Sequence, residues 1–162
     1  MAWTIGMFDG VHIGHQALLR RLSSFGAPSA VLTFPEHPLA LLAPQDAPRL
    51  ITQLPQKLKR FEELGVSVAL VVPFTKEFAL TPYDVLLESL RPSHLVFGER
   101  AAFGKGREGT PERVRRWASS HGVHVEYVEK TMFAGEPVSS SRVRASLALI
   151  EALLGRTFTE FS

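Results

Sequence analysis

The sequence contains no cysteine, so neither a disulfide framework nor a thiolate metal site is available to this chain. It has no apolar run long enough to span a membrane, and its first residues lack the basic region and apolar stretch of a secretory signal. Its 18 Lys and Arg against 16 Asp and Glu leave a net charge of only +2, which does not indicate a nucleic-acid partner. These absences favour a cytoplasmic protein.

The remaining composition predicts one globular domain of the α/β class. The chain has 162 residues, of which 45% are hydrophobic and 21% charged, the balance of a protein with a sizeable core. It has no internal repeat, heptad pattern or low-complexity linker. Short apolar runs alternate with helix-like segments, as in βαβ units around a mostly parallel sheet. The five predicted strands cover residues 3–5, 30–34, 66–72, 95–97 and 123–128.

Capping signals and spacing predict the helices between these strands. Residues 16–22 carry leucines at helical spacing, residues 55–64 end at Gly65, and an apolar helix covers residues 145–154. The pairs Thr81-Pro82 and Thr110-Pro111 each place a capping hydroxyl before a proline, which predicts two more helix starts. The proline-containing stretch 36–48 predicts an irregular loop, and the glycine-rich stretch 98–109 a mobile one.

The strongest chemical signal is the segment 6–15, Gly-Met-Phe-Asp-Gly-Val-His-Ile-Gly-His, between the first predicted strand and the first predicted helix. In a doubly wound sheet this junction lies at the edge where ligands bind. His12 and His15 are three residues apart, so on a first helical turn they project from the same side. Gly14 lets a phosphate approach the backbone, and a helix N-terminus attracts anions. The segment therefore predicts a polyphosphate site in which two imidazoles donate hydrogen bonds.

Two other interpretations of the histidines stay open. They can be surface or capping residues, or they can belong to a metal site. Zinc requires a third ligand, and no cysteine or further histidine lies nearby in sequence. The neighbouring Gly6, Asp9 and Gly10 favour the phosphate site, although Asp9 can equally be a turn or N-cap residue.

A second constellation is the segment 138–144, Val-Ser-Ser-Ser-Arg-Val-Arg, directly before the predicted helix 145–154. Consecutive hydroxyls can cap a helix or bind phosphate oxygens, and the Arg144 guanidinium can grip the same oxygens. Three serines before a helix are often only a cap. Because the sequence already predicts a phosphate site, which needs a second wall, phosphate binding by this segment is favoured.

These motifs resemble those of a known family. Residues 6–15 are similar to the G-x-F-D-G-x-H-x-G-H signature of the nucleotidylyltransferase superfamily, specifically bacterial FAD synthetase. Residues 138–144 resemble its I-S-S-T-x-I-R, residues 33–38 its T-F-x-P-H-P, and residues 103–109 its F-G-x-x-R-x-G. The similarity covers nearly the whole chain and implies a Rossmann-like doubly wound, mostly parallel sheet of the HxGH nucleotidylyltransferase type.

The resemblance implies transfer of AMP from MgATP to FMN, giving FAD and pyrophosphate, with His12, His15 and Arg144 as catalytic residues. It implies ATP-binding residues Gly6, Met7, Phe8, Asp9, His12, Gly14, His15, Gly98, Ser139, Ser140, Ser141 and Arg144. It implies flavin-binding residues Thr33, His37, Pro38, Arg100, Phe103 and Arg107. Mg²⁺ would be shared with the substrate phosphates, and its protein ligands are not identified.

Three departures from the family pattern define the alternatives. After Gly98 the family usually has G-x-D/N-F-x-F-G, whereas this chain has Arg100 and Ala101 at the polar and aromatic positions. Pro35-Glu36 shifts the loop that carries His37. These changes leave open a non-catalytic nucleotide- or flavin-binding module, and adenylyl transfer to another phosphorylated acceptor such as phosphopantetheine. Residues 33–38 favour FMN over the latter.

The third departure is length. Members of this family usually continue into a riboflavin kinase domain, and residues 154–158 resemble the start of the linker to it. We therefore expect residues 1–162 to form a single FMN adenylyltransferase domain without riboflavin kinase activity, supplied with FMN made elsewhere. Conversion of riboflavin and ATP to FMN by this chain would refute that expectation. The sequence gives no indication of oligomeric state.

Overall fold

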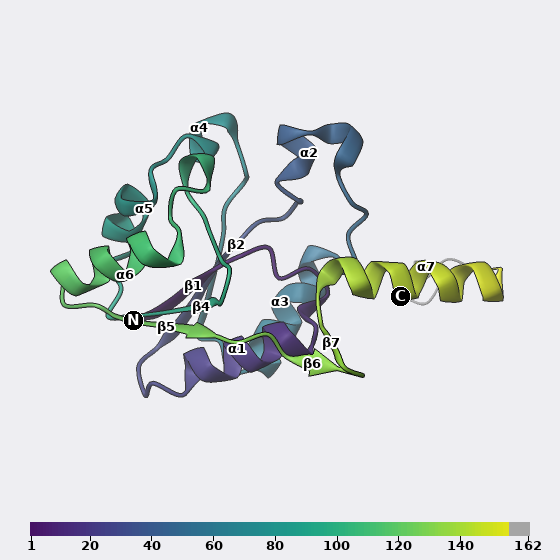
Figure 1. Cartoon of the computed structure of the whole chain (residues 1–162), viewed down its shortest axis with the longest axis horizontal. Helices are drawn as coiled ribbons and strands as arrows, with labels where there is room; N and C mark the ends of the chain where they lie inside the picture. Colours follow the sequence, from purple (N-terminus) through teal and green to yellow (C-terminus); the bar gives the residue numbers. More distant parts are fainter. Residues whose placement is uncertain (156–162) are drawn as a thin grey trace.

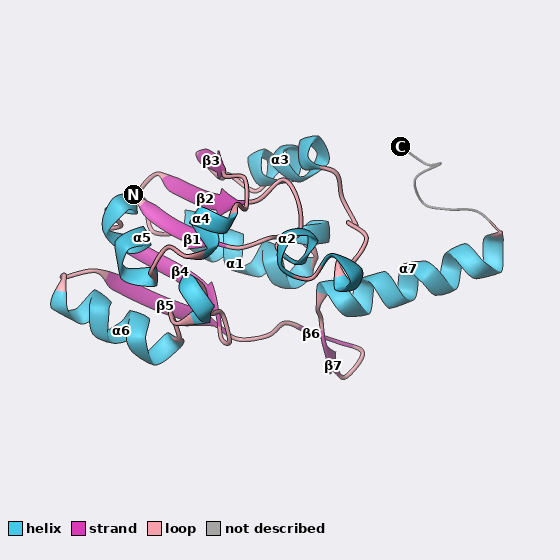
Figure 2. Cartoon of the chain, turned by 90° about the horizontal axis from the view of Figure 1, so that it is seen from above, coloured by secondary structure: helices cyan, strands magenta, loops and turns pink. Residues whose placement is uncertain are grey.

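The central element of the fold is a parallel sheet of five strands, seen side by side in Figure 2. A computed structural model describes residues 1–155. The strands are β1 (Ala2–Ile5), β2 (Ser29–Thr33), β3 (Val68–Val71), β4 (His94–Gly98) and β5 (His124–Val128), in the order β3-β2-β1-β4-β5. All neighbours pair in parallel, and each predicted strand is present, shifted at its ends by up to two residues.

Helices cover both faces of the sheet (Figure 1). Alternate strand residues point to opposite faces, so Leu95 and Phe97 pack in one cluster and Val96 in the other. Helices α5 (Tyr83–Leu90) and α6 (Pro111–Ser120) cover the first face. Helices α1 (Ile13–Ser23) and α3 (Leu54–Glu63) cover the second. The predicted α/β class and doubly wound, Rossmann-like arrangement are confirmed.

Some predicted helix boundaries are confirmed and others are wrong. Thr110 caps α6, because its Oγ1 accepts from the Arg113 N–H. Thr81 does not cap α5, which begins after Pro82. Its hydroxyl instead donates to the Glu77 carbonyl, because the preceding helix α4 (Lys76–Ala79) lies within reach.

The two predicted loops contain short helices. The stretch 36–48 holds α2 (Leu39–Leu42) and the 3₁₀ turn η2 (Pro44–Asp46), so it is less irregular than predicted. The stretch 98–109 holds the 3₁₀ turn η3 (Lys105–Arg107) and is closed by a bridge between Phe103 and Gly109. These local hydrogen bonds give structure to a stretch that was predicted only as a mobile loop.

The last described helix projects away from the sheet (Figures 1 and 2). Helix α7 (Ser140–Leu154) follows a hairpin of β6 (Met132–Phe133) and β7 (Glu136–Pro137). It begins five residues before the predicted start, because Ser139 caps it by accepting from the Arg142 N–H. Most of the linker-like segment predicted at residues 154–158 lies outside the described residues. No helix among residues 1–155 is long and apolar enough to cross a membrane.

Candidate active site

A tight turn connects β1 to α1 and contains the 3₁₀ turn η1 (Asp9–Val11). Its backbone is left-handed at Phe8, Gly10 and Val11, where φ is 52°, 79° and 36°. This conformation is costly for Phe8 and Val11, which lack the freedom of glycine, and such strain is often retained at functional sites. A side chain at Gly10 would also meet Ile51 at 3.0 Å. The turn therefore depends on surrounding contacts to hold its shape.

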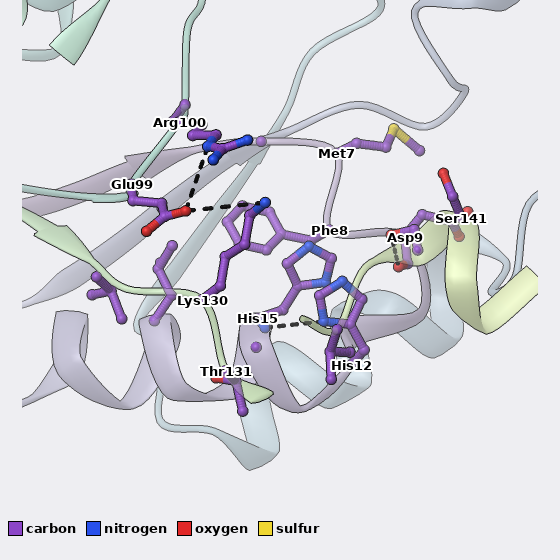
Figure 3. Close-up of a pocket in the computed structure, with 18 of the residues that line it drawn as sticks. Met7, Phe8, Asp9, His12, His15, Glu99, Arg100, Lys130, Thr131 and Ser141 are labelled. Carbon is purple, nitrogen blue, oxygen red and sulfur yellow. Dashed lines mark hydrogen bonds and ion pairs between the residues drawn. The ribbon is translucent and has the colours of Figure 1, made fainter. Parts of the chain in front are cut away.

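His12 and His15 lie side by side at the start of α1 (Figure 3). Their ring centroids are 3.6 Å apart and the ring planes differ by 16°. The prediction that they project from the same side is confirmed. His12 is also the N-cap of α1, since its Nδ1 accepts from the His15 backbone N–H at 3.3 Å. The capping interpretation and a role in the site are therefore compatible for His12.

Both imidazoles are electrically neutral near pH 7. Burial lowers the pKa of His12, and burial together with the charges of His12 and Lys57 lowers the pKa of His15 to about 3. Because Nδ1 of His12 accepts a hydrogen bond, its single proton resides on Nε2. Nδ1 of His15 is buried without a partner. The pair can therefore donate hydrogen bonds to an anion as neutral dipoles.

A pocket of about 430 Å³ opens at the carboxyl edge of the sheet, above the histidine pair. Its walls are the β1–α1 turn, the start of α7, His37, and the segments that follow β4 and β5. Most of the predicted ATP-binding residues line it: Gly6, Met7, Phe8, Asp9, His12, Gly14, His15, Gly98, Ser140, Ser141 and Arg144. Two of the predicted flavin-binding residues, His37 and Arg100, line it as well. Residues distant in sequence thus meet around one space.

Five predicted site residues do not line this pocket. Ser139 caps α7, and Pro38 stands at the start of α2. Thr33 is buried and donates its hydroxyl to the Met7 carbonyl at 3.2 Å. Phe103 packs against Phe97, with ring centroids 5.1 Å apart. Arg107 lies in η3 with a left-handed backbone. The structure therefore brings together the predicted ATP residues more completely than the predicted flavin residues.

Asp9 connects three segments at the wall of the pocket. Its carboxylate is 2% exposed, accepts from the backbone N–H groups of Ile51 and Thr52, and pairs with Arg144 Nη2 at 2.6 Å. Its carbonyl accepts from the Ser140 hydroxyl at 2.9 Å. Asp9 lines the pocket, and its carboxylate binds partners 42 or more residues away in sequence, so it is more than a local turn or N-cap residue. The arginine predicted to grip phosphates is thus already positioned by a carboxylate.

Sequence reasoning missed four polar residues at or below the pocket. Glu99, Lys130 and Thr131 line it, and Glu99 Oε1 lies 3.6 Å from Arg100 Nε and 4.0 Å from Lys130 Nζ (Figure 3). Lys130 and Thr131 follow a predicted strand, so the rule that ligands bind beyond strand ends was a usable signal. Lys57 is buried below the turn, and no periodicity or capping pattern marks it as a site residue.

The described residues offer no protein cage for a metal ion. No group of three His, Asp or Glu side chains among residues 1–155 is placed to hold one. Both oxygens of Asp9 already accept hydrogen bonds. The donor set fits a metal that arrives with a phosphate ligand better than a resident one.

Solved structures define the class of fold. A pantoate-β-alanine ligase from Francisella tularensis superposes with a TM-score of 0.63 at 16% identity, covering 89% of this chain and 65% of that one. A structure from Streptococcus pneumoniae described as a macrolide-efflux protein gives a TM-score of 0.81 at 24% identity, covering 96% of this chain and 55% of that one. These likenesses and the parallel sheet with helices on both faces define a Rossmann-like α/β fold.

Sequence comparison identifies the family within this class. Residues 1–142 match the FAD synthetase family, and the chain belongs to it. The bifunctional riboflavin kinase/FMN adenylyltransferase of Escherichia coli K12 is 38% identical, over 96% of this chain and 54% of that protein. A putative protein of the same description from Geobacillus thermodenitrificans is 34% identical, over 86% of this chain and 78% of its own length. The chain spans about half the length of the E. coli relative.

Proposed function

We propose that this chain transfers the adenylyl group of MgATP to the phosphate of FMN, giving FAD and pyrophosphate. A phosphate oxygen of FMN forms a bond to the α-phosphorus of ATP. The bond from that phosphorus to the bridging oxygen breaks, and pyrophosphate leaves with the electron pair. The main support is the stacked His12–His15 pair, at a helix N-terminus on the wall of a pocket, in a chain of the FAD synthetase family.

The chemistry suits the site because the nucleophile is already an anion. No strong general base is then required, and the protein's task is to align the two substrates and stabilise the charge that develops on phosphate oxygens. Neutral imidazoles can donate hydrogen bonds to these oxygens, as can the first N–H groups of α1. Both stabilise the developing charge without transferring a proton to the substrate. In this proposal His12 and His15 contact the ATP phosphates.

The start of α7 supplies the opposite wall. Ser141 and Arg144 line the pocket, and Arg144 is held in place by Asp9 at 2.6 Å. A guanidinium fixed by one carboxylate still has further N–H groups with which to bind phosphate oxygens. Mg²⁺ enters as part of MgATP and neutralises part of the phosphate charge.

The test is to replace each histidine and measure FAD and pyrophosphate together. We expect His12→Ala and His15→Ala each to lower kcat by roughly 10²- to 10³-fold, as removal of one stabilising donor does elsewhere. His124→Ala is the matched control, because His124 is exposed at the start of β5, away from the pocket. Unchanged turnover in both pocket variants would contradict the mechanism.

A binding module without catalysis is the second candidate. Glu99 lies within ion-pair distance of both Arg100 and Lys130 at the pocket, so two cations available to an acceptor phosphate already have a protein partner. Isothermal titration with FMN and MgATP separates the two functions. Binding of either ligand without release of pyrophosphate would favour the module, whereas turnover with phosphopantetheine and none with FMN would indicate another acceptor.

A further inference from the structure

Lys57 is a buried charged side chain for which the proposed chemistry has no direct use. It lies on α3, is 1% exposed, and does not line the pocket. Its Nζ donates to the Phe34 carbonyl at 2.7 Å and to the Met7 carbonyl at 3.1 Å. Burying an ammonium group costs free energy, so lysine is seldom found inside a protein without specific partners. The two carbonyls are those partners.

These carbonyls belong to the ends of two adjacent strands. Met7 follows β1 and begins the turn that presents His12 and His15. Phe34 follows β2 and begins the segment that leads to His37. Met7 and His37 both line the pocket, although they belong to different loops. One ammonium group therefore links the loop predicted to bind ATP to the loop predicted to bind flavin.

The charge on Lys57 strengthens this link at neutral pH. Burial lowers the pKa of Lys57 to about 8, and Asp9 of η1 raises it in part. His15 of α1 is the other titratable group in electrostatic contact, because the Lys57 charge lowers the pKa of His15. Below pH 8 both hydrogen bonds are charge-assisted, and above it the neutral amine keeps two N–H donors of lesser strength.

We propose that Lys57 is a positioning residue for adenylyl transfer: by holding the Met7 and Phe34 carbonyls together, it fixes the two substrate loops at the separation that in-line attack requires. The inference rests on the proposed function. Lys57 does not contact the substrates. Its contribution lies in the alignment of two bound molecules, and a displacement of about 1 Å in such a site can cost roughly 10²-fold in rate.

The test compares Lys57→Met with Lys59→Met, which removes the same charge from an exposed position of the same helix. We expect K57M to lower kcat by roughly 10²-fold, while the affinity for the magnesium complex of α,β-methylene-ATP, measured by titration calorimetry, changes by less than about 5-fold. K59M should match the wild type in both. If K57M does not unfold cooperatively, Lys57→Gln, which retains an N–H donor, takes its place.

The pH profile provides a readout that a purely structural role would not move. Wild-type kcat should fall as pH rises through about 8, where Lys57 loses its proton, and this alkaline limb should be absent from K57M. The inference is overturned if the wild type forms FAD and the kcat of K57M equals the wild-type kcat. It is also overturned if K57M retains the fall in kcat at alkaline pH. A loss of analogue affinity as large as the loss of kcat does so too. Absence of FAD from the wild type is a different result and counts against the proposed function.

Discussion

Two ion pairs with the same N–O distance should contribute very differently to stability. Arg144–Asp9 and Arg60–Glu63 both measure 2.6 Å. The side chains of the first pair are 20% and 2% exposed, and those of the second 54% and 42%. Charges in water gain little from pairing, whereas a buried charge that loses its partner has no solvent to replace it. Burial, and not distance, should decide the energy.

The perturbation is Asp9→Asn, with Glu63→Gln as the matched control. An asparagine oxygen can still accept from the Ile51 and Thr52 N–H groups, so the main loss is the charge opposite Arg144. Breaking a buried pair costs about 3–5 kcal/mol, and the partial exposure of Arg144 favours the lower end, about 3 kcal/mol. The exposed control should cost about 0–1 kcal/mol.

Equilibrium unfolding in urea measures both values. At about 2–4 °C per kcal/mol for a chain of this size, the Asp9→Asn variant should also melt about 6–12 °C below the wild type. Asp9→Ala should be worse still, because it leaves the two backbone donors without an acceptor, at about 1–3 kcal/mol each. If Asp9→Asn and Glu63→Gln differ by less than about 1 kcal/mol, burial does not govern these pairs and the reasoning is wrong.

Two further predictions concern pH and backbone geometry. Because the pKa of His15 is about 3 in the folded chain and near 6.5 when unfolded, the unfolded state binds the extra proton between these values. The free energy of unfolding should therefore fall as pH decreases from about 6.5 to 3. In His15→Gln the slope of this free energy against pH should be smaller. Equal slopes in the variant and the wild type would argue against a buried neutral imidazole. Gly104→Ala should destabilise the chain by more than the roughly 1–3 kcal/mol of backbone strain at φ 76° and ψ −178°, a conformation open essentially to glycine alone, since its Cβ would also lie 2.7 Å from the Tyr83 backbone. Gly106→Ala, at φ 58° and ψ 18° in the left-handed region and with open space around its Cβ, should cost only about 1 kcal/mol, and equal melting temperatures of the two variants would refute the argument.

Local pattern was sufficient to predict the framework of the fold. The five strands and the cap at Thr110 depend on residues within a few positions of one another, through side-chain alternation and N–H groups at helix starts. The same holds for His12 and His15, whose side chains lie on the same side because they are three residues apart at a helix start. For these features the sequence and elementary geometry were enough.

Local pattern did not reveal the contacts that complete the site. Asp9 and Arg144 are 135 residues apart, and Lys57 meets the Met7 carbonyl across 50 residues. No periodicity or capping rule encodes such a meeting, because the strand order and the packing of α3 on the sheet decide it. Burial likewise lowers the pKa of His15 to about 3, a consequence of surroundings that only folding creates. The sequence indicated most of the polar groups that line the pocket, and tertiary structure determined their partners and their charge.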